Sequence, residues 1–388
     1  MGLRVAGLFA GIGGIELGLE RAGHQTDLLC ENDPAARVVL KSKFPEVPLK
    51  GDVQSLRSLP RVDLVAAGFP CQDLSQAGET NGIRGSKSGV VKRLMQLIEE
   101  RPTSRRPAWI LIENVPFMLH LARGRAIKYL TDQLSDLGYM WAYRVVDTRA
   151  FGLPQRRRRI LLLASRSGDP RWVLLAQDRG EPEPISIDGR ACGFYWTEGN
   201  RGLGWAIDAI PPLKGSSGLG IPSPPAIWMP DGRIVLPNIR DAERLQGFPR
   251  NWTKAAADER RREGARWRLI GNAVSVPVSE WIGSRLKSVG EYDGWDTHVI
   301  TNGEGWPNAA WGMGRKAYRV ELSAWPVRRK GEPLQGFLRY PPAPLSARAS
   351  RGFLARLKAS NLRVHDRFIV DLEEHVARMN GKTALRMS

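Results

Sequence analysis

Cys71 is the residue in this sequence best suited to nucleophilic chemistry. It follows Pro70 just after the apolar run Val62–Ala67, and a polar stretch of small residues comes next. A thiol at the rim of a cleft becomes a nucleophile when nearby cations lower its pKa. The alternative is a small buried hydrophobe, the commonest role of a lone cysteine. The other cysteines, Cys30 and Cys192, form no CxxC pair with it, so neither a disulfide framework nor a zinc site is predicted.

A carboxylate and a pair of arginines are the next candidates for chemistry. Glu113 directly follows the apolar run Trp109–Ile112, where an unused charge would be unfavourable. A capping or ion-pair role is the alternative to a role in a site. Four arginines precede a further apolar run, and side chains alternate along a strand, so Arg157 and Arg159 are expected on one face. That face meets either an anion or solvent.

A glycine-rich turn between a strand and a helix indicates a nucleotide-like ligand. The apolar run Leu3–Phe9 leads into residues 10–14, which contain three glycines, and the helical stretch Ile15–Ala22 follows. Such a turn lets a ligand approach the helix N-terminus, although a tight turn also needs glycine for its own φ angles. Glu31 is placed to accept hydrogen bonds from ribose hydroxyls, and Asp52 to bind an adenine amino group. Together these features predict a nucleoside cofactor.

The glycine-rich turn, Glu31, Cys71 and Glu113 follow the ends of predicted strands. Strands are expected at Leu3–Phe9, Thr26–Cys30, Val62–Ala67, Trp109–Ile112, Arg144–Asp147 and Ile160–Ala164, with helices at Ile15–Ala22 and Pro34–Phe44. This alternation predicts an α/β fold with a doubly wound, mainly parallel sheet. Ligands of such sheets bind at the carboxyl ends of the strands, which is where the candidates lie.

The pattern changes after residue 165. Residues 166–237 are rich in Gly and Pro and have little periodicity, which predicts a loop-rich domain with short strands. Residues 238–289 return to a helical pattern that includes Ser275–Leu286. Beyond residue 290, helices are expected at Ser346–Ala359 and Asp366–Met379.

Charge and composition narrow the class of protein. The chain has 388 residues, with 58 Lys and Arg against 40 Asp and Glu, a formal net charge of +18. A basic excess spread along the chain suits a protein that lies along a polyanion, although a GC-rich genome produces a similar excess of arginine. A hydrophobic share of 42% excludes a disordered tail protein and a collagen-like chain. The sequence has neither an apolar run of membrane-spanning length nor a signal-peptide pattern, so a cytoplasmic, nucleoid-associated protein is expected.

Taken in order, six sequence blocks resemble those of the C5-cytosine DNA methyltransferases. They are Phe9–Gly14, Pro70-Cys71-Gln72, Glu113-Asn114-Val115, Gln155–Arg159, Arg240–Pro249 and Gly271–Val274. Six blocks in family order are far more specific than any one of them. The resemblance covers residues 1–289 and does not reach the rest of the chain. It implies a Rossmann-like S-adenosylmethionine-dependent methyltransferase fold with a smaller, loop-rich target recognition domain and a C-terminal extension that contains helices.

The resemblance also implies a division into three regions. Residues 1–165 would form the catalytic S-adenosylmethionine-binding domain, completed by residues 265–289. Residues 166–264 would hold the target recognition domain and the block that follows it. Residues 290–388 would form an extension that either contacts DNA, docks a partner or acts as a structural cap.

By resemblance, the catalytic residues are Cys71, Glu113, Arg157 and Arg159. Members of the family flip the target cytosine out of the duplex, because C5 cannot be reached inside the stack. Cys71 would attack C6 of the flipped base, Glu113 would hold its N3 and amino edge, and the two arginines would steady the base and the catalytic groups. The DNA-binding residues Gln72 and Ser75 would lie on the loop that approaches the duplex.

The cofactor implied by the resemblance is S-adenosyl-L-methionine. The expected binding residues are Phe9, Gly11, Gly13, Glu31, Asn32, Asp52, Val53, Pro70, Asn272 and Val274. The first three would surround the methionine part, Glu31 would bind the ribose and Asn32 would contact the adenosine. Asn32 differs from the bulky apolar or aromatic residue often found there, so adenine packing is expected to differ. The sequence offers no cluster of ligands for a metal.

The predicted partner is double-stranded DNA, methylated at cytosine C5 by a DNA (cytosine-5-)-methyltransferase that acts as a monomer. A cognate restriction or defence protein is a further expected partner, and no membrane is expected. Three alternatives stay open: a transfer-RNA cytosine-5 methyltransferase of the same fold, a catalytically inactive DNA-binding relative and a dinucleotide-dependent oxidoreductase. The segment Gln72–Ser75 and the sizeable region 166–237 favour DNA over RNA. Intact Cys71, Glu113, Arg157 and Asn272 argue against an inactive relative. An oxidoreductase would leave Cys71, Glu113 and the arginine pair unexplained.

Overall fold

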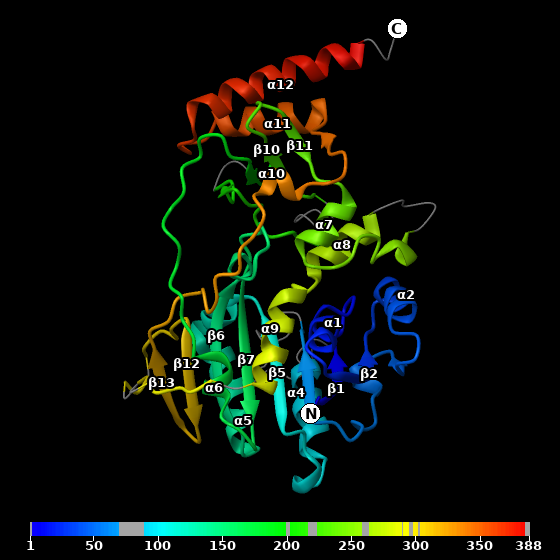
Figure 1. The fold of residues 1–388 in the computed structure, drawn as a ribbon, viewed down its shortest axis with the longest axis vertical. Helices are drawn as coiled ribbons and strands as arrows, with labels where there is room; N and C mark the ends of the chain where they lie inside the picture. The colour runs from blue at the N-terminus through cyan, green and yellow to red at the C-terminus, as the bar shows by residue number, and fades with distance from the viewer. Residues whose placement is uncertain are drawn as a thin grey trace. The chain divides into compact units, whose positions relative to one another are not determined.

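The computed structural model describes residues 2–69, 89–198, 202–215, 223–257, 264–288, 290–294, 298–301 and 303–384 (Figure 1). The chain forms two compact units. The first comprises Met1–Phe151, Arg158–Glu181 and Ala273–Arg329, and the second comprises Gly152–Arg157, Pro182–Asn272 and Lys330–Ser388. Each unit is therefore assembled from segments that lie far apart in the sequence.

A nine-stranded sheet is the centre of the described part of the first unit, in the order β13-β12-β6-β7-β5-β4-β1-β2-β3. Its strands are β1 (Arg4–Leu8), β2 (Gln25–Cys30), β3 (Leu49–Lys50), β4 (Leu64–Ala67), β5 (Trp109–Asn114), β6 (Met140–Asp147), β7 (Arg158–Ser165), β12 (Ala309–Met313) and β13 (Lys316–Val320). Strands β1 to β5 pair in parallel, whereas β7 and β12 run against their neighbours. This arrangement confirms the predicted mainly parallel α/β sheet.

Helices cover both faces of this sheet. They are α1 (Gly14–Arg21), α2 (Pro34–Lys43), α4 (Gly89–Glu99), α5 (Arg125–Asp136), α6 (Pro170–Leu174) and α9 (Val276–Lys287), with the 3-10 turns η1 (Val53–Ser55), η2 (Thr103–Arg105), η3 (Pro116–Leu119), η4 (Leu121–Gly124) and η5 (Thr148–Phe151). Apolar residues of α4 and α5 pack on one face, and those of α1, α6 and α9 on the other. Burial on both faces explains why the strands read as continuous apolar runs rather than as alternating ones.

The hairpin β12–β13 extends the sheet beyond β6. Ala309 pairs with Arg144 and Gly312 with Trp141, in an antiparallel register. The sequence predicted helices, but no strands, beyond residue 290. The hairpin was not predicted because β12 contains Gly312 and β13 contains Lys316 and Arg319, so the two strands show little period-two alternation.

The second unit is built on a five-stranded sheet with the order β14-β11-β10-β8-β9, counted over its described residues. Its elements are β8 (Cys192–Phe194), β9 (Ala206–Ile207), β10 (Ala226–Trp228), β11 (Ile234–Leu236), β14 (Ala343–Pro344), α7 (Ile239–Leu245), η6 (Lys254–Ala256), α8 (Gly264–Asn272), α10 (Leu334–Phe337), α11 (Ala347–Lys358) and α12 (Asp366–Ala384). Short strands do occur within the Gly- and Pro-rich residues 166–237, but residues 166–181, which include α6, belong to the first unit.

Residues 290–388 do not form one separate extension. Residues up to Arg329 belong to the first unit, and those from Lys330 onward belong to the second. The physical reason lies in β10, where Ile227 faces a core with α7, α8 and α10, while Ala226 and Trp228 face α11 and α12. A sheet that is apolar on both faces needs a cover on each, and the C-terminal helices supply one of them.

Candidate functional site

The glycine-rich turn after β1 is held by a carboxylate from the neighbouring strand. Phe9, Gly11 and Gly13 all have left-handed backbones, with φ of 57°, 56° and 82°. The backbone N–H of Gly11 donates to Glu31 Oε2 at 2.8 Å, and that of Asp33 donates to Glu31 Oε1 at 2.8 Å. Burial raises the pKa of Glu31, and these two N–H groups oppose the shift by binding the ionised form. Glu31 thus fixes the turn, a role that the sequence did not reveal.

One side of this turn is open and the other is closed. A Cβ built on Gly11 would meet no atom within 4 Å, whereas one on Gly13 would lie 2.4 Å from the ring of Phe44. Phe9 packs edge-on against Phe69, with ring centroids 6.0 Å apart. The open side at Gly11, next to the Glu31 carboxylate, leaves room for a ligand at the start of α1.

The other predicted cofactor residues of this unit lie near the ends of β2 and β3. Asn32 is exposed and precedes Asp33, the N-cap of α2, whose side chain accepts from Ala35 N at 2.9 Å. Asp52 is exposed and accepts from the N–H of Gln54, while Val53 is buried. These carboxylate and amide groups therefore reach solvent at the same edge of the sheet as Glu31.

Glu113 and Arg159 form an ion pair at the carboxyl end of β5. The Arg159 Nε atom lies 3.0 Å from Glu113 Oε1, and Glu113 is only 8% exposed. A Cβ on Gly68, after β4, would lie 3.9 Å from Glu113 Oε2 and 3.8 Å from a methyl group of Val274. The structure thus gathers Glu113, Arg159 and Val274 around the end of β4, which leads to Pro70.

Asn114 ties the ends of β4 and β5 together. Its side-chain amide donates to the carbonyl of Phe69 at 3.0 Å, and its Oδ1 accepts from Val115 N at 2.8 Å. Phe69 is the last described residue before the segment 70–88. The predicted residues Pro70, Cys71, Gln72 and Ser75 lie outside the described residues. The sequence offered Asn114 only as part of a motif, and its anchoring of Phe69 follows from the structure.

Arg157 belongs to the second unit, whereas Arg159 belongs to the first. Strand β7 begins at Arg158, one residue after Arg157. Arg157 is buried, Arg158 is exposed and Arg159 is half-buried, and the expected common face of Arg157 and Arg159 stays a prediction. The Arg157 guanidinium is buried and donates to the carbonyls of Leu213 and Gly271 at 3.1 and 3.3 Å. Gln155 is also buried and binds the Leu245 carbonyl at 2.9 Å.

Asn272 is the last residue of α8 and is exposed. Gly215 packs so closely against it that a Cβ there would lie 2.3 Å from Asn272 Oδ1. Within the same unit, Glu243 accepts from Arg266 at 3.0 Å and from the hydroxyl of Thr253 at 2.6 Å. The sequence block around Arg240–Pro249 therefore includes a buried polar network in addition to any contact with a ligand.

Glu16 is a buried carboxyl that the sequence did not single out. It lies in the first turn of α1 and is 1% exposed, and neither of its oxygens has a hydrogen-bond partner among the described groups. A Cβ on Gly7 of β1 would lie 2.0 Å from Glu16 Oε1, so only glycine leaves space for this carboxyl. Burial raises its pKa to about 8. Its position in a helical pattern gave no signal, since burial depends on the sheet beneath.

The described residues also bear on metals and membranes. Within these ranges, no group of three or more His, Cys, Asp or Glu side chains is arranged to hold a metal ion. None of the helices in the described part of the chain has the length and apolar content to cross a bilayer.

The sequence profile of the C-5 cytosine-specific DNA methylases matches residues 3–184 and 237–288, which together make up more than half of the chain. The chain belongs to this family. The type II methyltransferase M2.BsuMI of Bacillus subtilis (strain 168) is 53% identical over 384 residues, which cover 96% of this chain and 97% of that protein. The type II methyltransferase M.BsuFI of Bacillus subtilis is 34% identical over 301 residues, or 72% of this chain and 71% of that protein. The chain is a type II DNA (cytosine-5-)-methyltransferase.

Solved structures agree with this assignment at the level of the fold. The S. pombe Dnmt2 methyltransferase aligns with a TM-score of 0.51 and 19% identity, over 74% of this chain and 98% of that one. The Entamoeba histolytica methyltransferase EhMeth aligns with a TM-score of 0.51 and 16% identity, over 74% of this chain and 100% of that one. These likenesses confirm the predicted α/β methyltransferase fold.

Proposed function

We propose that this methyltransferase modifies C5 of a cytosine flipped out of a specific duplex DNA sequence, through a covalent bond between Cys71 and C6. The observation that best supports this chemistry is the Glu113–Arg159 ion pair at the end of β5. A buried carboxylate beside a guanidinium presents an acceptor and donors together, which suits the polar edge of a base. Flipping is required because the stacked base cannot be reached by groups held at a sheet edge.

The residues of the first unit fit S-adenosylmethionine as the methyl donor. The open side of Gly11 leaves space at the start of α1, and the carboxylate of Glu31 lies beside it. We assign the cofactor to Phe9, Gly11, Gly13, Glu31, Asn32, Asp52, Val53, Pro70, Asn272 and Val274. When bound, the cofactor supplies an electrophilic methyl group. The chain's own part is to hold the ribose hydroxyls and the amino-acid end.

The proposed reaction divides one difficult substitution into three easier steps. The Cys71 thiolate adds to C6, and the electron pair of the C5–C6 bond becomes available at C5. Glu113 holds the N3 and amino edge, so the ring carries the added electron density more readily. After C5 gains the methyl group, loss of the C5 proton restores the double bond and expels the thiolate. Arg157 and Arg159 are proposed to steady the base and the catalytic groups, and Gln72 and Ser75 to contact DNA.

The test is transfer of a labelled methyl group from S-adenosylmethionine to duplex DNA, with RNA as the parallel substrate. We expect labelled 5-methylcytosine in DNA, and labelling of RNA alone would show the substrate to be a transfer RNA. Duplex DNA that contains 5-fluorocytosine is expected to form a stable adduct, because fluorine blocks the final loss of a proton. Full activity of Cys71→Ser would contradict the covalent mechanism.

The biological role that we propose is protection of host DNA within a restriction-modification system in the bacterial cytoplasm. The support is the high identity to a type II methyltransferase over nearly the whole length of both chains. The expected partners are double-stranded DNA, engaged by a monomer, and a cognate restriction endonuclease that cuts the unmethylated sequence. Methylation-sensitive sequencing of host DNA, with and without this gene, tests the role and gives the target sequence.

A further inference from the structure

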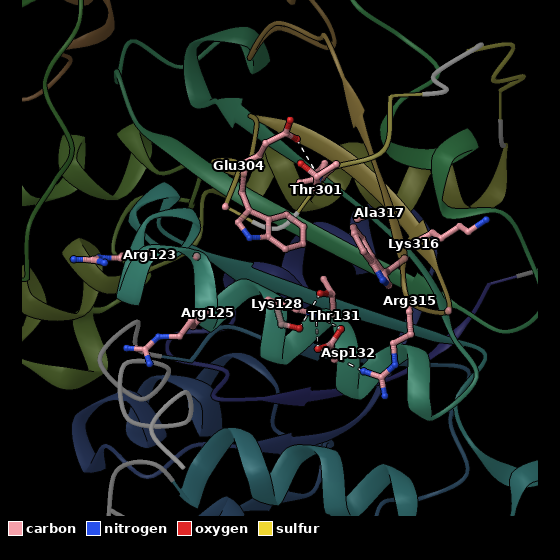
Figure 2. Close-up of a pocket in the computed structure, with 16 residues that line it drawn as sticks. Arg123, Arg125, Lys128, Thr131, Asp132, Thr301, Glu304, Arg315, Lys316 and Ala317 are labelled. Atoms are coloured by element: carbon pink, nitrogen blue, oxygen red, sulfur yellow. Dashed lines mark hydrogen bonds and ion pairs between the residues drawn. The ribbon is translucent and has the colours of Figure 1, made fainter. Parts of the chain in front are cut away.

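A cavity of about 480 Å³ lies between α5 and the β12–β13 hairpin, entirely within the first unit (Figure 2). Residues from 300–301, 303–306 and 314–317 supply one wall, and η4 and α5 supply the other, with Trp141 of β6 also in the lining. The family profile ends at residue 288, so one wall is built by a part of the chain that the profile does not match. Its volume falls in the range of ligand-binding clefts, roughly 300–1,000 Å³.

The charges are distributed unevenly along this cavity. Figure 2 shows Arg123 and Arg125 at one end and Arg315 at the other, with Lys128 and Asp132 between them. Lys128 pairs with Asp132 at 2.9 Å, and Arg315 lies 3.5 Å from the same carboxylate. Lys128 and Arg315 therefore have carboxylate partners, whereas Lys316, which also lines the cavity, forms no ion pair with a described carboxylate.

The other end is an unbalanced basic rim, formed by Arg123 and Arg125. Both side chains are exposed, and in Figure 2 they extend toward the same side. No carboxylate of the described chain forms an ion pair with either of them; the one polar contact is from Arg125 Nε to the carbonyl of Ala122, at 3.2 Å. Besides Asp132, the acidic residue in the described lining is Glu304, which accepts from the N–H of Thr301 at 3.0 Å.

The backbone adds positive potential at the same place. Helix α5 begins after Gly124, and no side chain caps it, so its first N–H groups and the positive end of its dipole adjoin the basic rim. Ala122 and Arg123 hold left-handed conformations, with φ of 51° and 57°, which are unfavourable for residues other than glycine. The ring of Trp306 packs against Gly124, so closely that a Cβ on Gly124 would lie 2.5 Å from the ring. This contact holds the turn in place.

The basic rim also lies at the edge of the sheet where the proposed chemistry takes place. Strand β5 ends with Glu113 and Asn114, and η3 and η4 lead directly from there to Arg123. Strand β12 runs against β6, so the start of β12 and the preceding Trp306 lie at this same edge. Arg166, by contrast, follows β7 at the opposite edge, where Ser165 pairs with Trp109.

We propose that Arg123 and Arg125 bind a backbone phosphate of the DNA duplex beside the target cytosine, with the sugar–phosphate unit entering the mouth of the cavity. This inference rests on the proposed function, because it takes duplex DNA as the polyanion. Two exposed guanidinium groups without carboxylate partners and an uncapped helix N-terminus match a phosphate in charge and in hydrogen-bonding capacity. The contact adds affinity without reading sequence.

The test compares Arg123→Gln/Arg125→Gln with the wild-type enzyme in a salt series of DNA affinity. Each lost phosphate contact is expected to make the slope of log affinity against log salt shallower by about 0.9, and to weaken binding roughly tenfold at about 0.1 M salt. The loss should be the same for target and unrelated duplexes. Arg166→Gln removes the same charge at the opposite edge and is expected to leave the slope unchanged.

Coincident slopes for the double variant and the wild type would overturn the proposal while leaving the methyltransferase function intact. Failure of the wild-type enzyme to bind or methylate duplex DNA would overturn both. A third outcome identifies another source of phosphate: if ATP alone bound the wild type and not the double variant, and DNA slopes were equal, the cavity would belong to a free nucleotide. Unchanged affinity of the double variant for S-adenosylmethionine shows that the first unit is intact.

Discussion

At the scale of single residues, Glu113 is held as a charged group in a buried position by its ion pair with Arg159. A carboxylate that is 8% exposed needs a partner, and Arg159 supplies one at 3.0 Å. The same arrangement leaves the second oxygen of Glu113 directed toward the end of β4, near Gly68. The ion pair therefore keeps a charged group at a buried position, which is where the proposed mechanism needs it to meet the edge of the base.

Glu113→Gln removes the charge and preserves the shape of this side chain. We expect kcat to fall by about 10²–10⁴, the usual range for one positioned acid–base or electrostatic group, with a smaller change in DNA affinity. Single-turnover methyl transfer measures the effect. Glu181→Gln is the matched control, because Glu181 forms an exposed ion pair with Arg158 at 2.8 Å, and its loss should leave kcat within about twofold. Equal losses in the two variants would contradict a specific role for Glu113.

Glu16 makes stability depend on pH. Its pKa in the folded chain is about 8, above the 4.5 of an exposed glutamate, because burial penalises the charged form. The folded state therefore holds a proton that the unfolded chain releases, and the stability from this proton is lost as pH rises from about 4.5 to 8. Glu16→Gln does not titrate. We expect its Tm to exceed that of the wild type by an amount that grows from pH 5 to 8 and then levels off.

Thermal unfolding of both proteins across this pH range gives the measurement. Glu46→Gln, which changes an exposed glutamate, provides the control and should follow the wild type at every pH. A difference between Glu16→Gln and wild type that is constant with pH would show that Glu16 is ionised, or that its substitution acts through packing alone.

At the scale of elements, local pattern predicted most of what lies in the first unit. The predicted strand Trp109–Ile112 corresponds to β5, because a run of apolar residues marks a buried strand. The predicted helix Pro34–Phe44 corresponds to α2, because a proline often occupies the first turn of a helix. The helix expected at Asp366–Met379 continues to Ala384. The local pattern did not predict which elements pack together. Nothing in the sequences of α11 and α12 indicates that these helices cover the sheet of β10 and β11.

The packing of α12 on this sheet depends on an aromatic cluster around Phe368. Phe368 is fully buried and packs against Phe194, with ring centroids 5.1 Å apart, and against Trp205 at 5.0 Å. Phe368→Ala leaves a cavity in this cluster, and we expect a loss of about 3–5 kcal/mol in the free energy of unfolding of the second unit. Val370→Ala, two residues along and 52% exposed, should change it by less than about 0.5 kcal/mol. Urea unfolding followed by tryptophan fluorescence distinguishes them, and similar losses would mean that α12 does not pack on this sheet.

At the scale of the whole molecule, the candidate site illustrates what a sequence can and cannot specify. Residues at strand ends, such as Glu31 and Glu113, could be predicted because a parallel sheet brings its carboxyl ends to one edge. Two hydrogen bonds of the site could not be predicted. Gly11 N donates to Glu31, 20 residues away, and the Asn114 amide donates to Phe69, 45 residues away, and both depend on the local geometry of the folded chain. The placement of Arg157 in the second unit depends likewise on carbonyls far along the chain.

The net charge of +18 is the whole-molecule property that governs DNA affinity. Lysines and arginines that neutralise phosphates release counterions, so affinity should fall steeply with salt, by about 10³–10⁵ between about 50 and 200 mM if six to ten phosphates are contacted. The affinity for S-adenosylmethionine should change little over this range, because that ligand carries no phosphate. Fluorescence anisotropy with a labelled duplex gives the first measurement, and calorimetry gives the second. A DNA slope shallower than about 2 would mean that most of the basic excess lies away from the duplex, and that recognition rests on contacts to the bases.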